Sequence, residues 1–104
     1  MKATLLISRE LVLLGGKYVA NVTVNEVGKS KKFPDGIKAR FVLVNAEAGY
    51  PRLLVDNHQP YGFHMHTKLP HDKEHRVLLD VSDHNEALEV FRAEVERIIK
   101  NEKE

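Results

Sequence analysis

The residues best suited to chemistry lie in one short stretch, Asp56 to His66. It reads Asp-Asn-His-Gln-Pro-Tyr-Gly-Phe-His-Met-His and holds three of the six histidines of the chain beside a carboxylate, an amide and a turn. Histidine titrates near neutral pH and is a common metal ligand, so this composition indicates proton transfer or metal binding before it indicates packing. The candidate catalytic residues are Asp56, His58, His64 and His66.

His64 and His66 are spaced to share one face of an extended segment. In a strand, residues two apart have Cα atoms about 6.6 Å apart and side chains on the same side, so Phe63 and Met65 should face the other way. Pro60 and Gly62 just before the pair favour a turn. That turn would bring the preceding strand end beside the histidine pair.

Two chemistries fit this arrangement equally well. In one, a divalent metal is bound by His64 and His66, with His58 or Asp56 supplying a third ligand. In the other, no cofactor is required: one histidine takes the proton of a ribose 2′-hydroxyl and another protonates the leaving 5′-oxygen of RNA. A structural interpretation also stands, in which Asp56-Asn57-His58 forms a turn that hydrogen-bonds the backbone and the other histidines are solvated.

Basic residues cluster in the loop that precedes one predicted strand. Lys29-Ser30-Lys31-Lys32 continues to Lys38 and Arg40, which would suit an RNA backbone, although a solvated charged loop has the same composition. Arg52 is a candidate phosphate clamp or a partner in a cross-strand ion pair, and Tyr61 could stack on a base. The candidate substrate-binding residues are Lys31, Lys32, Lys38, Arg40, Arg52 and Tyr61.

The first three-quarters of the chain has the pattern of antiparallel strands. Ala3 to Leu14 is strongly apolar and can kink near Ser8-Arg9-Glu10, and Tyr18 to Asn25 alternates between apolar and polar residues. Ile37 to Asn45 alternates in the same way, and Tyr50 to Asn57 ends at the histidines. Arg76 to Asp80 is a candidate for a last strand.

A long helix is predicted at the C-terminal end. Asp83-His84-Asn85-Glu86 has the spacing of a capping box. Apolar residues follow at helical spacing: Leu88, Phe91, Val95, Ile98 and Ile99. The expected fold is therefore α+β, one domain over residues 1–104, with a single antiparallel sheet of about four to six strands covered by one helix.

Composition excludes several functional classes. Sixteen Lys and Arg against fifteen Asp and Glu give a net charge of +1, so no global field draws the chain to nucleic acid or a membrane. The absence of cysteine excludes disulfides and thiolate zinc sites. The charged first ten residues do not resemble a signal peptide or a membrane span. We expect a cytoplasmic protein with no membrane partner, in which an exposed edge strand would allow a homodimer.

The histidine segment also resembles a known family. Leu54-Val55-Asp56-Asn57-His58, followed by Gly62-Phe63-His64-Met65-His66, is similar to the signature of the TumE-type toxins of prokaryotic toxin–antitoxin modules. The segments Lys2 to Leu6, Phe33 to Lys38 and Phe91 to Glu96 lie where that family has comparable segments. The resemblance implies a toxin that inhibits growth and is paired with a helix-turn-helix antitoxin; it implies no reaction.

Two hypotheses follow from the sequence. In the first, the chain is a toxin that uses Asp56, His58, His64 and His66 as an endoribonuclease site acting on RNA phosphodiester bonds. In the second, it is a non-enzymatic domain whose histidine cluster is structural or holds a metal and whose function is to bind a protein partner. The two differ in whether the histidines line an open concave surface or point into the core.

Overall fold

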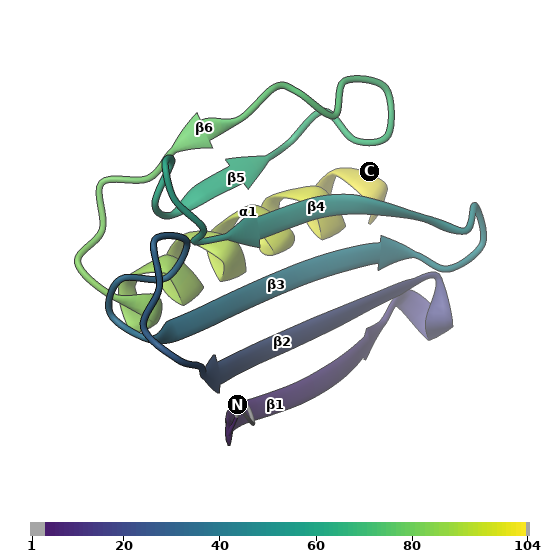
Figure 1. The fold of residues 1–104 in the computed structure, drawn as a ribbon. Coiled ribbons are helices and arrows are strands. Elements are labelled where there is room, and N and C mark those ends of the chain that lie inside the picture. The colour runs from purple at the N-terminus through teal and green to yellow at the C-terminus, as the bar shows by residue number, and fades with distance from the viewer. Residues whose placement is uncertain (1–3, 104) are drawn as a thin grey trace.

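A computed structural model describes residues 4–103 and shows one six-stranded antiparallel sheet and one helix (Figure 1). The elements are β1 (Thr4–Leu13), a short 3₁₀ turn (Leu14–Gly16), β2 (Tyr18–Glu26), β3 (Ile37–Asn45), β4 (Tyr50–Asp56), β5 (His64–His66), β6 (Val77–Leu78) and α1 (His84–Lys103). The strands lie in sequence order, each antiparallel to the next. The predicted α+β fold is therefore confirmed.

The first strand differs from its prediction in where it is irregular. The expected kink at Ser8-Arg9-Glu10 was wrong, because these residues pair regularly with β2 and the register shifts instead between Leu5 and Ile7. Ala3, the predicted first residue of this strand, lies outside the described residues. The last strand is also shorter than predicted, since β6 contains only two residues.

Helix α1 packs against one face of the sheet and forms the core there (Figure 1). The alternation predicted for β2 and β3 decides which side chains are inside. The buried residues of the sheet on this face are Tyr18, Ala20, Val22, Val24, Ala39, Phe41, Leu43, Leu53, Val55 and Met65, and those of the helix are Ala87, Phe91, Val95 and Ile98. At the centre, the rings of Phe41 and Phe91 lie 5.7 Å apart. In residues 4–103 no helix combines the length and hydrophobicity needed to cross a bilayer.

The helix begins with the predicted cap in a modified form. The Asp83 Oδ1 atom accepts a hydrogen bond from the backbone nitrogen of Glu86 at 3.0 Å. The Glu86 carboxylate reaches back to the backbone nitrogen of Ser82 at 2.8 Å, one residue before the cap. Two backbone donors at the helix start are thus satisfied.

Replacing Asp83 with alanine should lower the free energy of unfolding by about 1 kcal/mol, because a backbone donor in the first turn loses its acceptor. Urea denaturation followed by circular dichroism would measure this change. Ser82→Ala is the matched control and should change stability by less than about 0.5 kcal/mol, since only its backbone takes part in the cap. Equal effects of both substitutions would contradict this role of Asp83.

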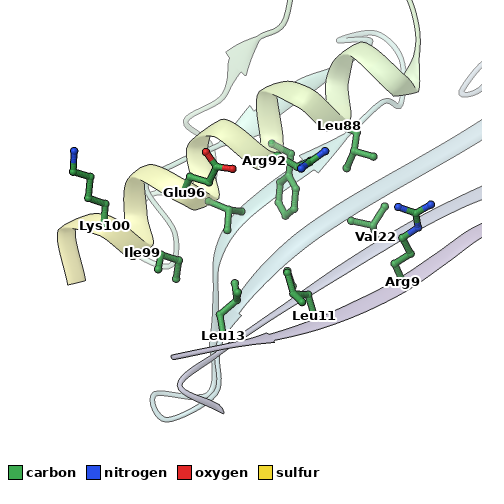
Figure 2. A pocket seen from close by; sticks show the side chains of 12 residues that line it. Arg9, Leu11, Leu13, Val22, Leu88, Arg92, Glu96, Ile99 and Lys100 are labelled. Atoms are coloured by element: carbon green, nitrogen blue, oxygen red, sulfur yellow. The ribbon is translucent and has the colours of Figure 1, made fainter. Parts of the chain in front are cut away.

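The helix leaves the β1 side of the sheet uncovered (Figure 1). A groove of about 660 Å³ runs between α1 and the first two strands (Figure 2). Its lining is mainly apolar, with Arg9, Arg92, Glu96 and Lys100 at its margins. Leu11 of β1 is 59% exposed. The first strand is therefore a long edge of the sheet with apolar side chains in solvent.

The face opposite the helix carries the polar residues of the strands. Strand register places Ser8, Thr23, Arg40, Asp56 and His64 in one row that crosses β1 to β5 on this face. We call it the helix-free face. The histidine pair lies here, and Met65 between the two histidines points into the core, as the alternation predicted.

Candidate functional site

The sheet register brings Asp56 and His64 together. Asp56 is the last residue of β4 and is directly paired with His64, the first residue of β5. Directly opposed residues of antiparallel strands project to the same face with Cβ atoms about 5 Å apart. The turn between these strands, which contains Pro60 and Gly62, returns the chain so that His58 joins them.

The four predicted catalytic residues form one group, which we call the Asp–His cluster (Asp56, His58, His64 and His66). The rings of His58 and His64 are perpendicular, with centroids 4.8 Å apart. The ring of His66 lies 5.2 Å from that of His64. The Nδ1 atom of His58 is 3.3 Å from the Oδ2 atom of Asp56. Residues spread over eleven positions of the sequence thus form one connected group.

Hydrogen bonds to carbonyl oxygens determine the tautomers of the two paired histidines. The Nδ1 atom of His64 is 2.7 Å from the Gly62 oxygen, and that of His66 is 3.1 Å from the His75 oxygen. A carbonyl oxygen has no proton, so both Nδ1 atoms must donate. In the neutral ring of His64 the Nε2 atom therefore keeps its lone pair, and this atom is buried with no hydrogen-bond partner.

Burial keeps His64 neutral. The residue is 0% exposed, and desolvation lowers the pKa of its imidazole below the ordinary value of 6.5. The hydrogen bond to Gly62 and the charge of Asp56 oppose this shift, whereas the neighbouring His58 and His66 add to it. At neutral pH the ring is thus a proton acceptor.

The lowered pKa of His64 predicts a loss of stability in acid. The imidazole of His64 binds a proton more readily in the unfolded chain than in the folded one. The stability that comes from keeping His64 neutral is therefore fully present above about pH 6.5 and is lost as the pH falls through the pKa of folded His64. Between about pH 7.5 and about pH 5.5, wild type should lose more unfolding free energy than His64→Gln, which cannot titrate there. The exposed His71→Gln is the control and should behave as wild type. Equal losses in wild type and His64→Gln would contradict the assignment.

Asn57 has a structural role at the edge of the site. Its side-chain oxygen accepts from the Ala39 nitrogen at 3.0 Å, and its amide nitrogen donates to the Ile37 oxygen at 2.8 Å. These bonds attach the end of β4 to the start of β3. The turn interpretation of Asp56-Asn57-His58 thus holds for Asn57. It also holds for Asp56, whose Oδ1 atom accepts a hydrogen bond from the Asn57 nitrogen at 2.7 Å. His64 and His66, in contrast, are buried and not solvated.

The predicted basic residues lie at different distances from the cluster. Arg40 is paired with Asp56 across the strands, and Lys38 lies two residues before Arg40 on the helix-free face; both are exposed. The loop with Lys31 and Lys32 lies beside the site, because the Gln59 nitrogen donates to the Lys32 oxygen at 2.9 Å. Arg40 is therefore the strand neighbour of the Asp–His cluster, and the backbone of the Lys31–Lys32 loop lies beside the turn that carries His58.

Arg52 is not brought to the cluster. It lies four residues before Asp56 on an extended strand, a separation of about 13 Å. Its guanidinium donates to the Thr67 oxygen at 3.1 Å and holds the loop after β5 against β4. Within the described residues Arg52 forms no ion pair across the strands, so the cross-strand ion pair expected from the sequence is not found.

Tyr61 does lie at the cluster, together with a residue that sequence reasoning missed. Its ring contacts those of His58 and His64 edge-on, at centroid distances of 5.8 and 5.5 Å. The Arg76 guanidinium lies over the face of the ring, with Cζ 4.1 Å from the centroid. Arg76 immediately precedes β6, and only the pairing of β6 with β5 places it here. The only feature of the sequence that pointed to Arg76 was its place at the start of the predicted last strand, Arg76 to Asp80.

Comparisons with known proteins give no identification. No family model, curated protein or solved structure matches the chain. Function has to be inferred from the site itself.

Three residues of the cluster could hold a metal ion. The donor atoms of Asp56, His58 and His64 all lie within 4.8 Å of one another. This set contains Asp56 in place of His66, the third histidine of the ligand set expected from the sequence. Nitrogen and carboxylate donors of this kind suit a divalent transition metal. The cluster can therefore support proton transfer or metal binding.

Proposed function

We propose that the chain is the toxin of a prokaryotic toxin–antitoxin module and that its Asp–His cluster cleaves RNA. The observation that most strongly supports RNA cleavage is that two neighbouring histidines, His58 and His64, lie in different environments. His64 is buried and neutral with a free Nε2 lone pair, whereas His58 is partly exposed with its Nδ1 atom beside the Asp56 carboxylate. Histidines in different environments suit the separate roles of base and acid.

In the proposed reaction, His64 Nε2 takes the proton of a ribose 2′-hydroxyl. The 2′-oxygen then forms a bond to phosphorus, the bond from phosphorus to the 5′-oxygen breaks, and protonated His58 gives its proton to that oxygen. Asp56 lies beside the Nδ1 atom of His58 and orients its ring, and His66 packs against His64. The products are a 2′,3′-cyclic phosphate and a 5′-hydroxyl end.

The toxin role rests on the resemblance of the histidine segment and implies a cytoplasmic protein with a helix-turn-helix antitoxin as partner. The test is inducible expression in a bacterial host with and without the product of the adjacent gene. We expect growth arrest that the neighbouring protein relieves. Normal growth at high expression, or arrest that the neighbour does not relieve, would contradict this role.

A second candidate function is a metal-holding binding domain without enzymatic activity. It is favoured by the burial of His64 Nε2, because a small ion reaches a buried nitrogen more readily than a nucleic acid does. The other ring nitrogen of His64, Nδ1, donates a hydrogen bond to the Gly62 carbonyl, as the second nitrogen of a metal-bound histidine commonly does. Calorimetric titration of chelator-treated protein with Zn²⁺ tests this candidate. One tight site that is lost in Asp56→Ala and kept in His71→Ala would support it.

A further inference from the structure

Two buried nitrogen atoms without hydrogen-bond partners belong to residues that contact the same tyrosine, Tyr61. In the described part of the chain, His64 Nε2 and Arg76 Nε are the buried side-chain polar atoms that have no hydrogen-bond partner. Both residues contact the ring of Tyr61. Unsatisfied buried polar atoms are few in folded proteins and often mark functional positions. Two of them around one ring indicate a place where a ligand completes the hydrogen bonding.

Arg76 is held in place by packing more than by an ion pair. Its guanidinium lies 4.1 Å above the centre of the Tyr61 ring, a cation–π geometry. Its nearest carboxylate is that of Glu74, 3.8 Å from the Nη2 atom, and the Glu74 side chain is 91% exposed. An exposed ion pair of this length contributes little to holding the guanidinium in place. The positive charge of Arg76 is therefore available to an anion at the site.

The chemistry of the two nitrogens defines the missing ligand. Arg76 Nε carries a proton and needs an acceptor, whereas neutral His64 Nε2 has a lone pair and needs a donor. A ribose phosphate offers both, since its 2′-hydroxyl donates and its phosphate oxygens accept. Arginine is well suited to phosphate, because its planar guanidinium can form two parallel hydrogen bonds.

We propose that Arg76 binds the phosphate at the scissile bond and that Tyr61 is the positioning residue for its guanidinium. This inference rests on the proposed RNA cleavage and adds to it the contact that stabilises the negative charge on phosphorus. The basic residues foreseen in the sequence, such as Arg40 and Lys32, then border the site and bind the flanking backbone. The phosphate contact comes from the segment just before β6.

Cleavage kinetics give the first test. Arg76→Ala should lower kcat/KM by about 10- to 100-fold, because it removes a charged hydrogen bond to the phosphate. Arg76→Lys keeps the charge but loses the planar fork, so it should recover part of this loss. Tyr61→Phe keeps the ring and should retain activity, whereas Tyr61→Ala should raise KM. Arg92→Ala is the control: it removes the same charge from an exposed position on the helix and should behave as wild type.

A binding measurement separates this inference from the proposed reaction. A fluorescent oligonucleotide with deoxyribose at every position cannot undergo attack by a 2′-oxygen, so anisotropy reports phosphate contacts alone. Arg76→Ala should weaken binding about tenfold and reduce the salt slope by about 0.7, while Arg92→Ala changes neither. Absence of cleavage by wild type, with this binding difference intact, would overturn the reaction and leave the Arg76 contact supported. Unchanged binding and unchanged kcat/KM in folded Arg76→Ala and Arg76→Lys would overturn the contact.

Discussion

Replacing His58 with alanine should lower the rate of RNA cleavage by about 10²- to 10⁴-fold, the usual effect of losing a general acid or base. His58 is the member of the Asp–His cluster best suited to this test, because it lies in the turn before β5 and is partly exposed. Its loss should leave the fold intact. Single-turnover cleavage of a labelled RNA, with circular dichroism as the check on folding, measures the effect.

The matched control is His71→Ala, which removes an exposed histidine from the loop after β5 and should cleave as wild type does. A double replacement of His64 and His66 by alanine should abolish toxicity. Both residues are buried, so that variant requires evidence that it folds before its result is read. A His58→Ala protein that cleaves RNA at the wild-type rate would rule out the proposed roles in the cluster.

Replacing Phe41 with alanine should lower the free energy of unfolding by about 3–5 kcal/mol, the largest effect expected of a single substitution in this core. Phe41 lies on β3 at the centre of the sheet, is fully buried and packs against Phe91 of the helix. Removing the ring leaves a cavity under α1 that the surrounding side chains fill only in part. Urea denaturation measures the loss, and a fall in melting temperature of roughly 10 °C or more should accompany it.

Leu11→Ala provides the contrast, because Leu11 lies in the open groove beside β1 and is mostly exposed (Figure 2). Its removal should change stability by less than about 0.5 kcal/mol. If Leu11→Ala destabilised the protein as much as Phe41→Ala, the groove would have to be filled in solution and the described burial would be incomplete.

The sheet and helix could be predicted because their side-chain periods are clear. The residues of β2 from Tyr18 to Val24 alternate without interruption, and one face is buried as expected. The helix was marked by its cap at Asp83 and by apolar residues at helical spacing. The irregularity of β1 was placed wrongly. A kink was expected at Ser8-Arg9-Glu10, yet an exposed edge strand tolerates charged residues without bending.

The composition of the site could be predicted more fully than its environment. Spacing alone put His64 and His66 on one face, and the turn at Pro60 to Gly62 brought His58 to them. Their burial was not predictable, because it depends on the loops that fold over the helix-free face. The position of Arg76 likewise depends on the tertiary fold and not on local sequence, since the pairing of the two-residue strand β6 places Arg76 over Tyr61.

The most direct test of the central claim is cleavage of a synthetic RNA oligonucleotide by purified wild-type protein, compared with the same sequence made entirely of deoxyribose. We predict cleavage of the RNA alone, with 2′,3′-cyclic phosphate and 5′-hydroxyl ends identified by mass spectrometry, and no cleavage by His58→Ala. Intact RNA after incubation with folded wild type, or equal cleavage of the deoxyribose strand, would contradict the account.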